Sequence, residues 1–249
     1  MKVVVIGGTG LIGSKLVSKL AEHGHEAVPA SPDSGVNTLT GEGLAEVLED
    51  AAVVVDVSNS PSFADDDVMT FFRTSTTNLL AAEKEAGVGH HVALSVVGTD
   101  RLQESGYFRA KQAQEELIKE YGVPYSIVHS TQFFEFMKGI AAAATKDDNT
   151  VHLAPVKIRP ICSDDVAAAV GRAAVGDPLN GVVEVAGPDT FRLDELIGMR
   201  LAAMNDTRTV VPDPRAPYYG AQLQEATLLP GADARIGEIR FADWVAQQQ

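Results

Sequence analysis

Val3-Val-Val-Ile-Gly7-Gly-Thr-Gly10-Leu-Ile-Gly13 is the stretch on which the fold depends. Val3 to Ile6 form a β-branched apolar run, which is typical of a strand buried on both faces. Three glycines follow at spacings of three, and Ser14 to His23 repeat apolar residues at helical intervals. A strand, a glycine turn and a helix in this order are the context that a dinucleotide-binding fingerprint requires.

Each glycine has a separate physical purpose in such a turn. Gly7 permits the tight turn, Gly10 lets the backbone approach a pyrophosphate, and Gly13 allows the helix and strand to pack closely. The free N–H groups at the helix start and the helix dipole favour the negative charge of the phosphates. The plainer alternative is a glycine-rich turn that binds nothing.

Strands and helices alternate along the first half of the chain. The predicted strands lie at 26–30, 51–57, 88–97 and 124–129, and the predicted helices at 43–50, 63–86 and 107–121. This alternation indicates an α/β fold with a doubly wound, mostly parallel, Rossmann-like sheet covered on both faces. We expect a dinucleotide-binding domain over 1–150 and a smaller α+β substrate lobe over 151–249, with room for some later segments to return to the sheet.

The composition restricts the classes of partner and compartment. The formal net charge of −14 argues against nucleic-acid binding, which requires a basic face. Cys162 is the only cysteine, so no internal disulfide forms and a reducing compartment fits. The chain contains no apolar run long enough for a membrane span, and its first strand begins too early for a signal peptide. We expect a cytoplasmic protein with a small-molecule substrate and no membrane partner.

Two adjacent histidines, His90 and His91, begin the fourth predicted strand. Neighbouring residues on a strand point to opposite faces, and no cysteine or acid lies at ligand spacing from them. We therefore expect no metal site.

The end of the second predicted strand distinguishes between coenzymes in this type of fold. An acid there hydrogen-bonds the ribose 2′-hydroxyl of NAD, whereas Arg or Lys accommodates the 2′-phosphate of NADP. Ser31 is neither, Asp33 would repel a phosphate, and this loop holds no Lys or Arg. Ser58 and Asn59 follow the third predicted strand, where ligands of such sheets bind; an ordinary turn capped by Ser62 is the alternative.

Tyr107 and Lys111 lie four residues apart at the start of a predicted helix, and this spacing places them on one helical face. A nearby ammonium lowers the pKa of a tyrosine, which makes the phenol a usable acid–base group. Ser95, near the end of the preceding strand, is placed to donate a hydrogen bond to a substrate carbonyl. The alternative is a surface tyrosine beside a solvated lysine.

These motifs together resemble the short-chain dehydrogenase/reductase superfamily, and most of all its atypical, NmrA-like branch of NAD(P)H-binding reductases. The matching segments are Gly7 to Gly13, Ser95, Tyr107-x-x-x-Lys111 and Ser163-Asp-Asp-Val-Ala167. The resemblance implies Tyr107 as proton donor, Lys111 at the nicotinamide ribose and Ser95 orienting the substrate. It also implies NADP(H), with NAD(H) as the alternative. The implied coenzyme contacts are Gly7, Thr9, Gly10, Leu11, Ile12, Ser31, Ser58, Asn59, Lys111, Thr131 and Phe133.

Three positions depart from the pattern of that superfamily. Phe72 falls where many relatives carry the asparagine of a catalytic tetrad, Thr40-Gly41 replace an acid that often meets the adenine, and Pro32 stands where NADP-using relatives tend to have arginine. The first departure concerns the proton relay, and the other two concern the coenzyme contacts.

Three functions fit these residues. The first is an NAD(P)H-dependent oxidoreductase that reduces a carbonyl or quinone-type molecule, with Tyr107 delivering the proton. The second is a redox-sensing binding protein that distinguishes NADP from NADPH. The third is a nucleotide-sugar epimerase-like enzyme, for which the short C-terminal lobe leaves less room. The substrate, the stereochemistry and the oligomeric state stay open.

Overall fold

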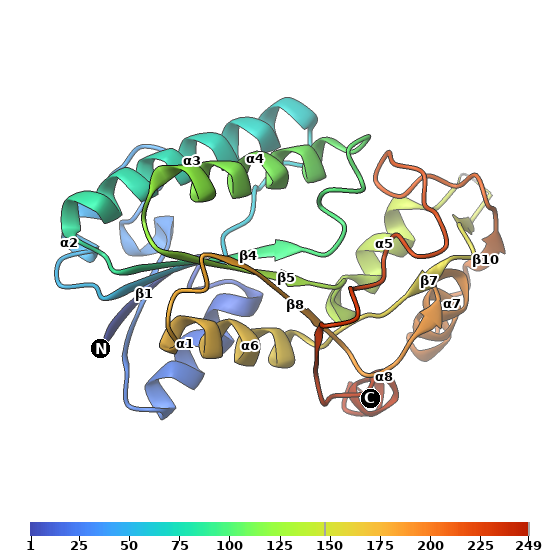
Figure 1. The fold of residues 1–249 in the computed structure, drawn as a ribbon. Coiled ribbons are helices and arrows are strands. Elements are labelled where there is room, and N and C mark those ends of the chain that lie inside the picture. The colour runs from blue at the N-terminus through green and yellow to red at the C-terminus, as the bar shows by residue number, and fades with distance from the viewer. Residues whose placement is uncertain (147, 249) are drawn as a thin grey trace.

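A seven-stranded sheet forms the centre of the computed structural model, which describes residues 1–146 and 148–248 (Figure 1). All pairings within this sheet are parallel. In spatial order the strands are β11 (Arg235–Ile236), β8 (Gly181–Ala186), β5 (Tyr125–Ser130), β4 (His90–Val96), β3 (Val53–Asp56), β1 (Lys2–Ile6) and β2 (Glu26–Ala30). The expected doubly wound, Rossmann-like α/β fold is confirmed.

β1 lies inside the sheet because both of its faces are apolar. Val3, Val4 and Val5 are fully buried, and β1 pairs with β2 on one side and β3 on the other. Val3 and Val5 enter the core cluster on one face, whereas Val4 enters the cluster on the other face. The strand order reverses at β1, so its carboxyl end lies at the topological switch point where such sheets bind ligands.

Helices cover both faces of the sheet (Figure 1). α1 (Leu11–Glu22) and α6 (Ser163–Val175) pack together on one face. α3 (Asp65–Ala86) and α4 (Gly106–Tyr121) pack together on the other face. The carboxyl edge of the sheet therefore lies between two helix layers, and α4 begins at that edge after β4.

All four predicted helices of this half of the chain differ at their ends from the observed ones, and α1 and α2 differ most. α1 begins at Leu11 rather than Ser14, because Gly10 takes the extended conformation of an N-cap. α2 (Leu44–Val47) is shorter than the predicted 43–50, because Gly43 and Asp50 have left-handed backbone conformations, with φ of 73° and 58°. Both differences concern element ends, which local backbone geometry decides.

A smaller lobe extends beyond the carboxyl ends of the strands (Figure 1). It has its own apolar core, in which Phe134 packs on Trp244 with ring centroids 5.5 Å apart. β6 pairs with β10, and β7 pairs with β9. The elements of the lobe are η2 (Phe134–Phe136), α5 (Met137–Ala143), β6 (Thr150–Leu153), β7 (Lys157–Ile158), β9 (Phe191–Arg192), α7 (Leu193–Ala203), β10 (Thr209–Pro212) and α8 (Phe241–Ala246).

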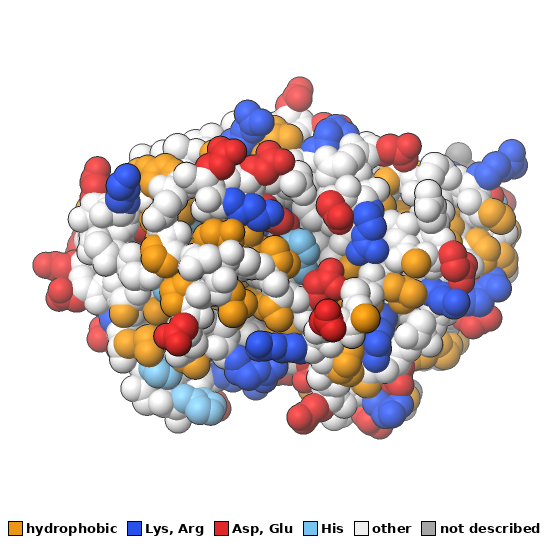
Figure 2. All heavy atoms as spheres, viewed as in Figure 1, with side chains coloured by type: hydrophobic (Ala, Val, Ile, Leu, Met, Phe, Trp, Pro, Cys, Tyr) orange, Lys and Arg blue, Asp and Glu red, His pale blue; other side chains and the backbone are white. Residues whose placement is uncertain are grey.

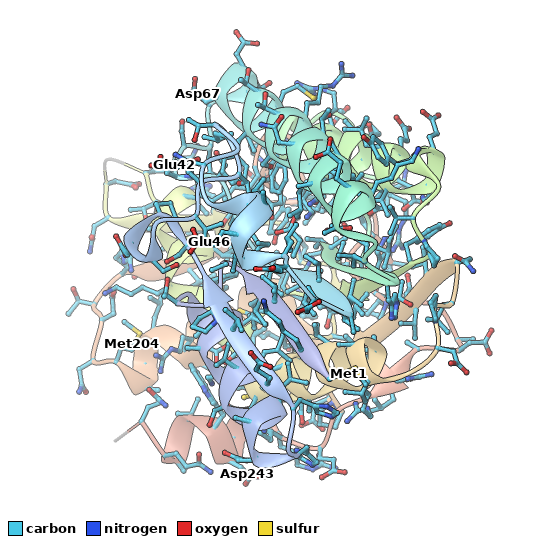
Figure 3. The ribbon with its side chains drawn as sticks, turned by 90° about the vertical axis from the view of Figure 1, so that its left-hand side faces the viewer. Met1, Glu42, Glu46, Asp67, Met204 and Asp243 are labelled. Atoms are coloured by element: carbon cyan, nitrogen blue, oxygen red, sulfur yellow. The ribbon has the colours of Figure 1, made fainter. Side chains whose placement is uncertain are left out.

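The surface carries charges of both signs. On the face in Figure 2, acidic and basic side chains are interspersed around a region where hydrophobic side chains gather. Glu42, Glu46 of α2 and Asp67 in the first turn of α3 are exposed acidic residues (Figure 3). None of the helices in the described part of the chain is both long and apolar enough to cross a membrane.

We expect Gly13→Ala to destabilise the protein by about 1–3 kcal/mol or to prevent folding, because the added Cβ overpacks a backbone contact. That Cβ would lie 2.1 Å from the Gly7 carbonyl oxygen and 2.6 Å from Gly8 Cα. Gly139→Ala is the matched control, since nothing lies within 4 Å of its added Cβ and the residue is helical. Urea denaturation should show Gly139→Ala as stable as the parent or more so; equal stability of the two variants would contradict this packing argument.

Candidate functional site

The turn after β1 brings two segments of backbone into contact. Gly7 has a φ of +76°, and a Cβ at this position would lie 2.9 Å from Ser58 Cα. Gly8 N–H and Gly7 N–H both donate to the carbonyl oxygen of Ala30, at 3.4 Å and 2.9 Å. The ends of β1, β2 and β3 therefore meet at one point of the carboxyl edge.

The N-terminus of α1 at this point is open and electropositive. It has no side-chain cap and no acidic residue in its first turn. The first backbone bond runs from Ser14 N–H to Gly10 O at 3.0 Å, so the N–H groups of Leu11, Ile12 and Gly13 precede it. Thr9, Gly10 and Leu11 are exposed, and a Cβ on Gly10 would meet only Gly7 O, at 3.3 Å. This arrangement fits a diphosphate.

The end of β2 offers a buried polar atom beside the glycine turn. Ser31 is 6% exposed, and its Oγ has no hydrogen-bond partner among the described residues. Asp33 follows in the short turn η1 (Pro32–Ser34). The unpartnered hydroxyl fits a ribose hydroxyl of a coenzyme.

Ser58 and Asn59 lie beside the glycine turn but use their side chains differently. Asp56 at the end of β3 accepts hydrogen bonds from Ser58 N–H and Ser58 Oγ at 2.9 Å and 2.6 Å. Asn59 Oδ1 accepts from Ser60 N–H at 3.0 Å, and its side chain lies close to the Tyr107 phenol. Asn59 therefore connects the switch point to the start of α4, whereas the Ser58 hydroxyl is already bonded.

The carboxyl end of β5 carries polar atoms without partners. Thr131 Oγ1 and both polar atoms of the Gln132 carboxamide are buried and make no hydrogen bond with described residues. Phe133 instead packs in the core, 8% exposed, with its ring 5.0 Å from that of Phe136. Gln132 belongs to the stretch from residue 131 to residue 133 that the resemblance places at the nicotinamide end, and within it the amide rather than Phe133 has unpartnered polar atoms.

Tyr107 lies at the start of α4, surrounded by aromatic rings. Its ring centroid is 5.6 Å from that of Phe63 and 6.2 Å from that of Phe72. Burial raises the pKa of the phenol to about 12, the nearby Tyr219 adds to this, and Asn59 opposes it. The expectation that Lys111 lowers the pKa of Tyr107 is therefore wrong, because desolvation dominates and the ammonium is engaged elsewhere.

Lys111 is 2% exposed and points into the layer between α4 and the sheet. Its ammonium donates to Leu94 O at 2.9 Å and to the side chain of Gln114, and lies 4.5 Å from the centre of the Phe72 ring. Burial lowers the pKa of this ammonium to about 8, against the opposing effects of Asp56 and Glu115. Lys111 thus bonds the protein itself, where the resemblance placed it at a ribose.

The structure does not bring Ser95 to Tyr107. Ser95 is 2% exposed, and its Oγ donates to Glu115 Oε1 at 2.6 Å. His129 Nε2 lies 2.8 Å from the same carboxylate oxygen. Glu115 stands eight residues after Tyr107 on α4, about 12 Å along the helix axis. The Ser95 hydroxyl is therefore bonded within the sheet–helix layer, away from the phenol.

A family model described as NAD(P)H-binding matches residues 7–175 of the chain. Two curated relatives are photosystem II assembly factors named Ycf39. The one from Cyanophora paradoxa is 24% identical over 85% of this chain and 72% of its own length. The one from Synechocystis sp. is 22% identical over 61% of this chain and 51% of its own length.

Solved structures share the fold across almost the whole chain. The Escherichia coli NADPH-dependent quinone oxidoreductase QOR2, complexed with NADPH, has a TM-score of 0.72 at 17% identity and covers 99% of both chains. The Thermus thermophilus UDP-glucose 4-epimerase in complex with NAD has a TM-score of 0.69 at 18% identity and covers 92% of both. At these identities the likeness concerns the fold alone.

Gly10→Asp should weaken coenzyme binding without loss of folding. The Gly10 backbone (φ −78°, ψ −176°) suits any residue, and Asp is a favourable N-cap, so α1 should be as stable or more so. The added carboxylate enters the space assigned to the diphosphate, and we expect its repulsion to weaken NAD(P)H binding at least about tenfold. Calorimetric titration measures the affinity. Gly10→Ser, which adds a neutral N-cap side chain, is the control that distinguishes the effect of the negative charge from that of the added side-chain volume. Parent-like affinity in Gly10→Asp would refute this placement.

Lys111→Met should remove a pH dependence of stability. The pKa of Lys111 lies near 8 in the folded protein, against 10.5 for the ordinary side chain. In that interval the unfolded chain binds more protons, so the free energy of unfolding of the parent rises with pH. From about pH 7 to pH 9.5 we expect a rise of about 2 kcal/mol from this residue. Urea denaturation at both pH values should show that the free energy of unfolding rises by this amount more in the parent than in Lys111→Met. An equal pH dependence of the two proteins would contradict the prediction.

Proposed function

Because this chain belongs to the NAD(P)H-binding family, we propose that it is an NAD(P)H-dependent oxidoreductase that reduces a carbonyl or quinone-type small molecule. The observation that carries this proposal is the position of Tyr107. Its phenol lies at the carboxyl edge of the sheet, beside Asn59, and Asn59 follows the strand that contacts the glycine turn. An acid and a coenzyme cradle thus share one edge of the sheet.

A nicotinamide coenzyme held at the glycine turn would supply the hydride that the substrate carbon accepts. The carbon–oxygen double bond then becomes a single bond, and the oxygen carries the negative charge. The Tyr107 phenol donates its proton to that oxygen, and water reprotonates the phenolate. A pKa near 12 keeps Tyr107 protonated at neutral pH, which suits a proton donor.

The residues that we assign to the coenzyme follow the edge from β2 to β5. Gly7, Thr9, Gly10, Leu11 and Ile12 hold the diphosphate. Ser31 meets the adenosine ribose, and Asn59 lies next to Tyr107. Thr131 and Gln132 meet the nicotinamide end, because their buried polar atoms have no partner in the described protein.

Lys111 acts in this scheme by holding α4 to the sheet. Its bond to Leu94 O and its contact with Phe72 attach the first turns of α4 to β4 and α3. The orientation of Tyr107 depends on this attachment, because the two residues lie one helical turn apart. Lys111 is therefore a positioning residue.

A coenzyme-binding protein without turnover is the second candidate. Two observations favour it: the curated relatives are assembly factors, and neither Lys111 nor Ser95 presents its polar atom to the Tyr107 site. Sustained oxidation of many equivalents of NADPH per protein supports the reductase, whereas tight coenzyme binding with no turnover across aldehydes, ketones and quinones supports this candidate. The epimerase-like alternative has only the shared fold in its favour.

Tyr107→Phe should lower kcat about 10²–10⁴-fold, because the ring packing remains and only the proton donor is lost. The affinity for NAD(P)H, measured by calorimetry, should match that of the parent. Tyr121→Phe, at the other end of α4, is the matched control and should retain turnover. If Tyr107→Phe turns over at the parental rate in an assay of NADPH absorbance, the assignment of the proton donor fails.

A further inference from the structure

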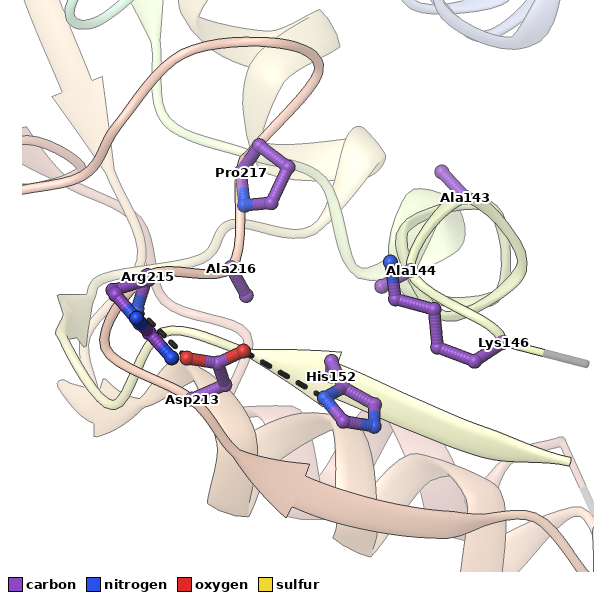
Figure 4. Close-up of a pocket in the computed structure, with 8 residues that line it drawn as sticks. All are labelled: Ala143, Ala144, Lys146, His152, Asp213, Arg215, Ala216 and Pro217. Atoms are coloured by element: carbon purple, nitrogen blue, oxygen red, sulfur yellow. Dashed lines mark hydrogen bonds and ion pairs between the residues drawn. The ribbon is translucent and has the colours of Figure 1, made fainter. Parts of the chain in front are cut away.

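A hollow of about 410 Å³ opens in the C-terminal lobe, outside the coenzyme site. Figure 4 shows that the end of α5 with Lys146 faces His152 of β6 and the segment from Asp213 to Pro217 across it. Its lining residues are Ala143, Ala144, Lys146, His152, Asp213, Arg215, Ala216 and Pro217. The polar groups therefore come from three separate stretches of chain that converge on one space.

The hollow concentrates positive charge in an acidic protein. The chain has 34 acidic residues against 20 Lys and Arg, yet this lining holds the two cations Lys146 and Arg215 with a single carboxylate, next to the His152 imidazole. Neither Lys146 nor Arg215 forms an ion pair with a carboxylate of the described residues. Lys146 and Arg215 are both exposed, and two exposed cations that converge on one hollow without an ion pair among the described residues favour an anionic ligand.

The one carboxylate, Asp213, is already engaged by its surroundings. Its Oδ1 accepts a hydrogen bond from Arg215 N–H at 2.9 Å, and its Oδ2 lies 3.7 Å from His152 Nδ1 (Figure 4). His152 Nε2 lies 3.0 Å from Thr150 Oγ1, which fixes the imidazole on both sides. Asp213 thus orients His152 and the Arg215 backbone. The hydrogen bond from Arg215 N–H, and to a lesser degree the Arg215 charge, lower the pKa of the Asp213 carboxyl. The guanidinium forms no ion pair with it, so the Arg215 guanidinium and the Lys146 ammonium can both bind a ligand.

A second hollow of about 120 Å³ continues the first one. The two share Ala143, Ala144 and Pro217, and the second adds the rings of Tyr218 and Tyr219. Its other lining residues include Ile140 and Leu153, so this part of the groove is apolar and aromatic. One groove therefore runs from a cationic end to an aromatic end.

The aromatic end lies next to Tyr107. Tyr107 and Tyr218 pack on the same apolar core, and Tyr219 is close enough to influence the ionisation of the Tyr107 phenol. The segment that carries both tyrosines is bonded to the loop before α4, since Gln222 N–H donates to Glu104 Oε2 at 2.7 Å. Tyr107 lines neither hollow, so a molecule with its reducible group at Tyr107 would enter the groove past Tyr218 and Tyr219 and extend toward Arg215.

We propose that the substrate is amphipathic, with a reducible ring or carbonyl at Tyr107 and a terminal oxyanion, a carboxylate or phosphate, bound by Arg215 and Lys146. This inference rests on the proposed reductase function for the position of the reducible group. The binding of the oxyanion depends on the lobe alone.

The test uses 1,4-naphthoquinones with alkyl tails of graded length that end in methyl, carboxylate or phosphate. With saturating NADPH, the kcat/KM of the parent should be about tenfold higher for an anionic tail than for the methyl tail. The difference should lie in KM, because it comes from a charged hydrogen bond at a partly exposed site. Arg215→Gln and the double variant with Lys146→Gln should lose this preference. Lys138→Gln is the matched control, because Lys138 is an exposed cation of α5 that does not line the hollow.

Calorimetric titration of the same compounds into the protein saturated with oxidised coenzyme separates the two proposals. If the parent binds the anionic compounds more tightly than the methyl compound and Arg215→Gln loses this preference, the oxyanion site is supported. This holds even if no quinone is reduced, in which case only the reductase proposal fails. Equal affinity of the parent for anionic and methyl tails overturns the oxyanion site, whatever the turnover. A preference confined to the phosphate or to the carboxylate tail identifies which oxyanion the site takes.

Discussion

The contact between Gly13 and the backbone of Gly7 and Gly8 is the constraint on which the rest of the structure depends. A Cβ at Gly13 would lie 2.1 Å from the Gly7 carbonyl oxygen, so helix and turn meet without an intervening side chain. This contact fixes where α1 starts and therefore where its free N–H groups lie. The close approach of Gly7 to Ser58 then joins the same point to the end of β3. The coenzyme cradle is thus a product of backbone packing.

A layer of buried polar side chains between α4 and the sheet gives this side of the core a defined arrangement. Lys111 bonds Leu94 O and Gln114, Gln114 Nε2 donates to Asp56 Oδ2 at 2.9 Å, and Asp56 in turn accepts from Ser58. The strand end beside the glycine turn is therefore connected to the helix that carries Tyr107. Because buried polar groups are costly when unpaired, these bonds restrict how α4 can slide on the sheet.

The sequence predicts the fold well because the signal is local and repeated. The apolar run of β1, the glycine spacing and the helical periodicity each act within a few residues, and the NAD(P)H-binding family model confirms the predicted class. The same reasoning misplaces side chains, since spacing shows which residues share a helix face but does not show what that face contacts. Tyr107 and Lys111 share a face, yet the ammonium turns to Leu94 O. The acceptor of the Ser95 hydroxyl, Glu115, lies twenty residues away, beyond the reach of any local pattern.

The strand order has a consequence for synthesis on the ribosome. β5 pairs with β4, which precedes it, and with β8, which is made about fifty residues later. Until β8 emerges, the backbone groups along one edge of β5 have no ladder partner, and the apolar residues on both faces of that strand remain near an open edge. Such an edge recruits other chains. The nascent protein therefore needs residues 131–180, which include α6 and part of the lobe, and then β8 before this edge of β5 is covered. A chain stalled within that segment would be a substrate for chaperones.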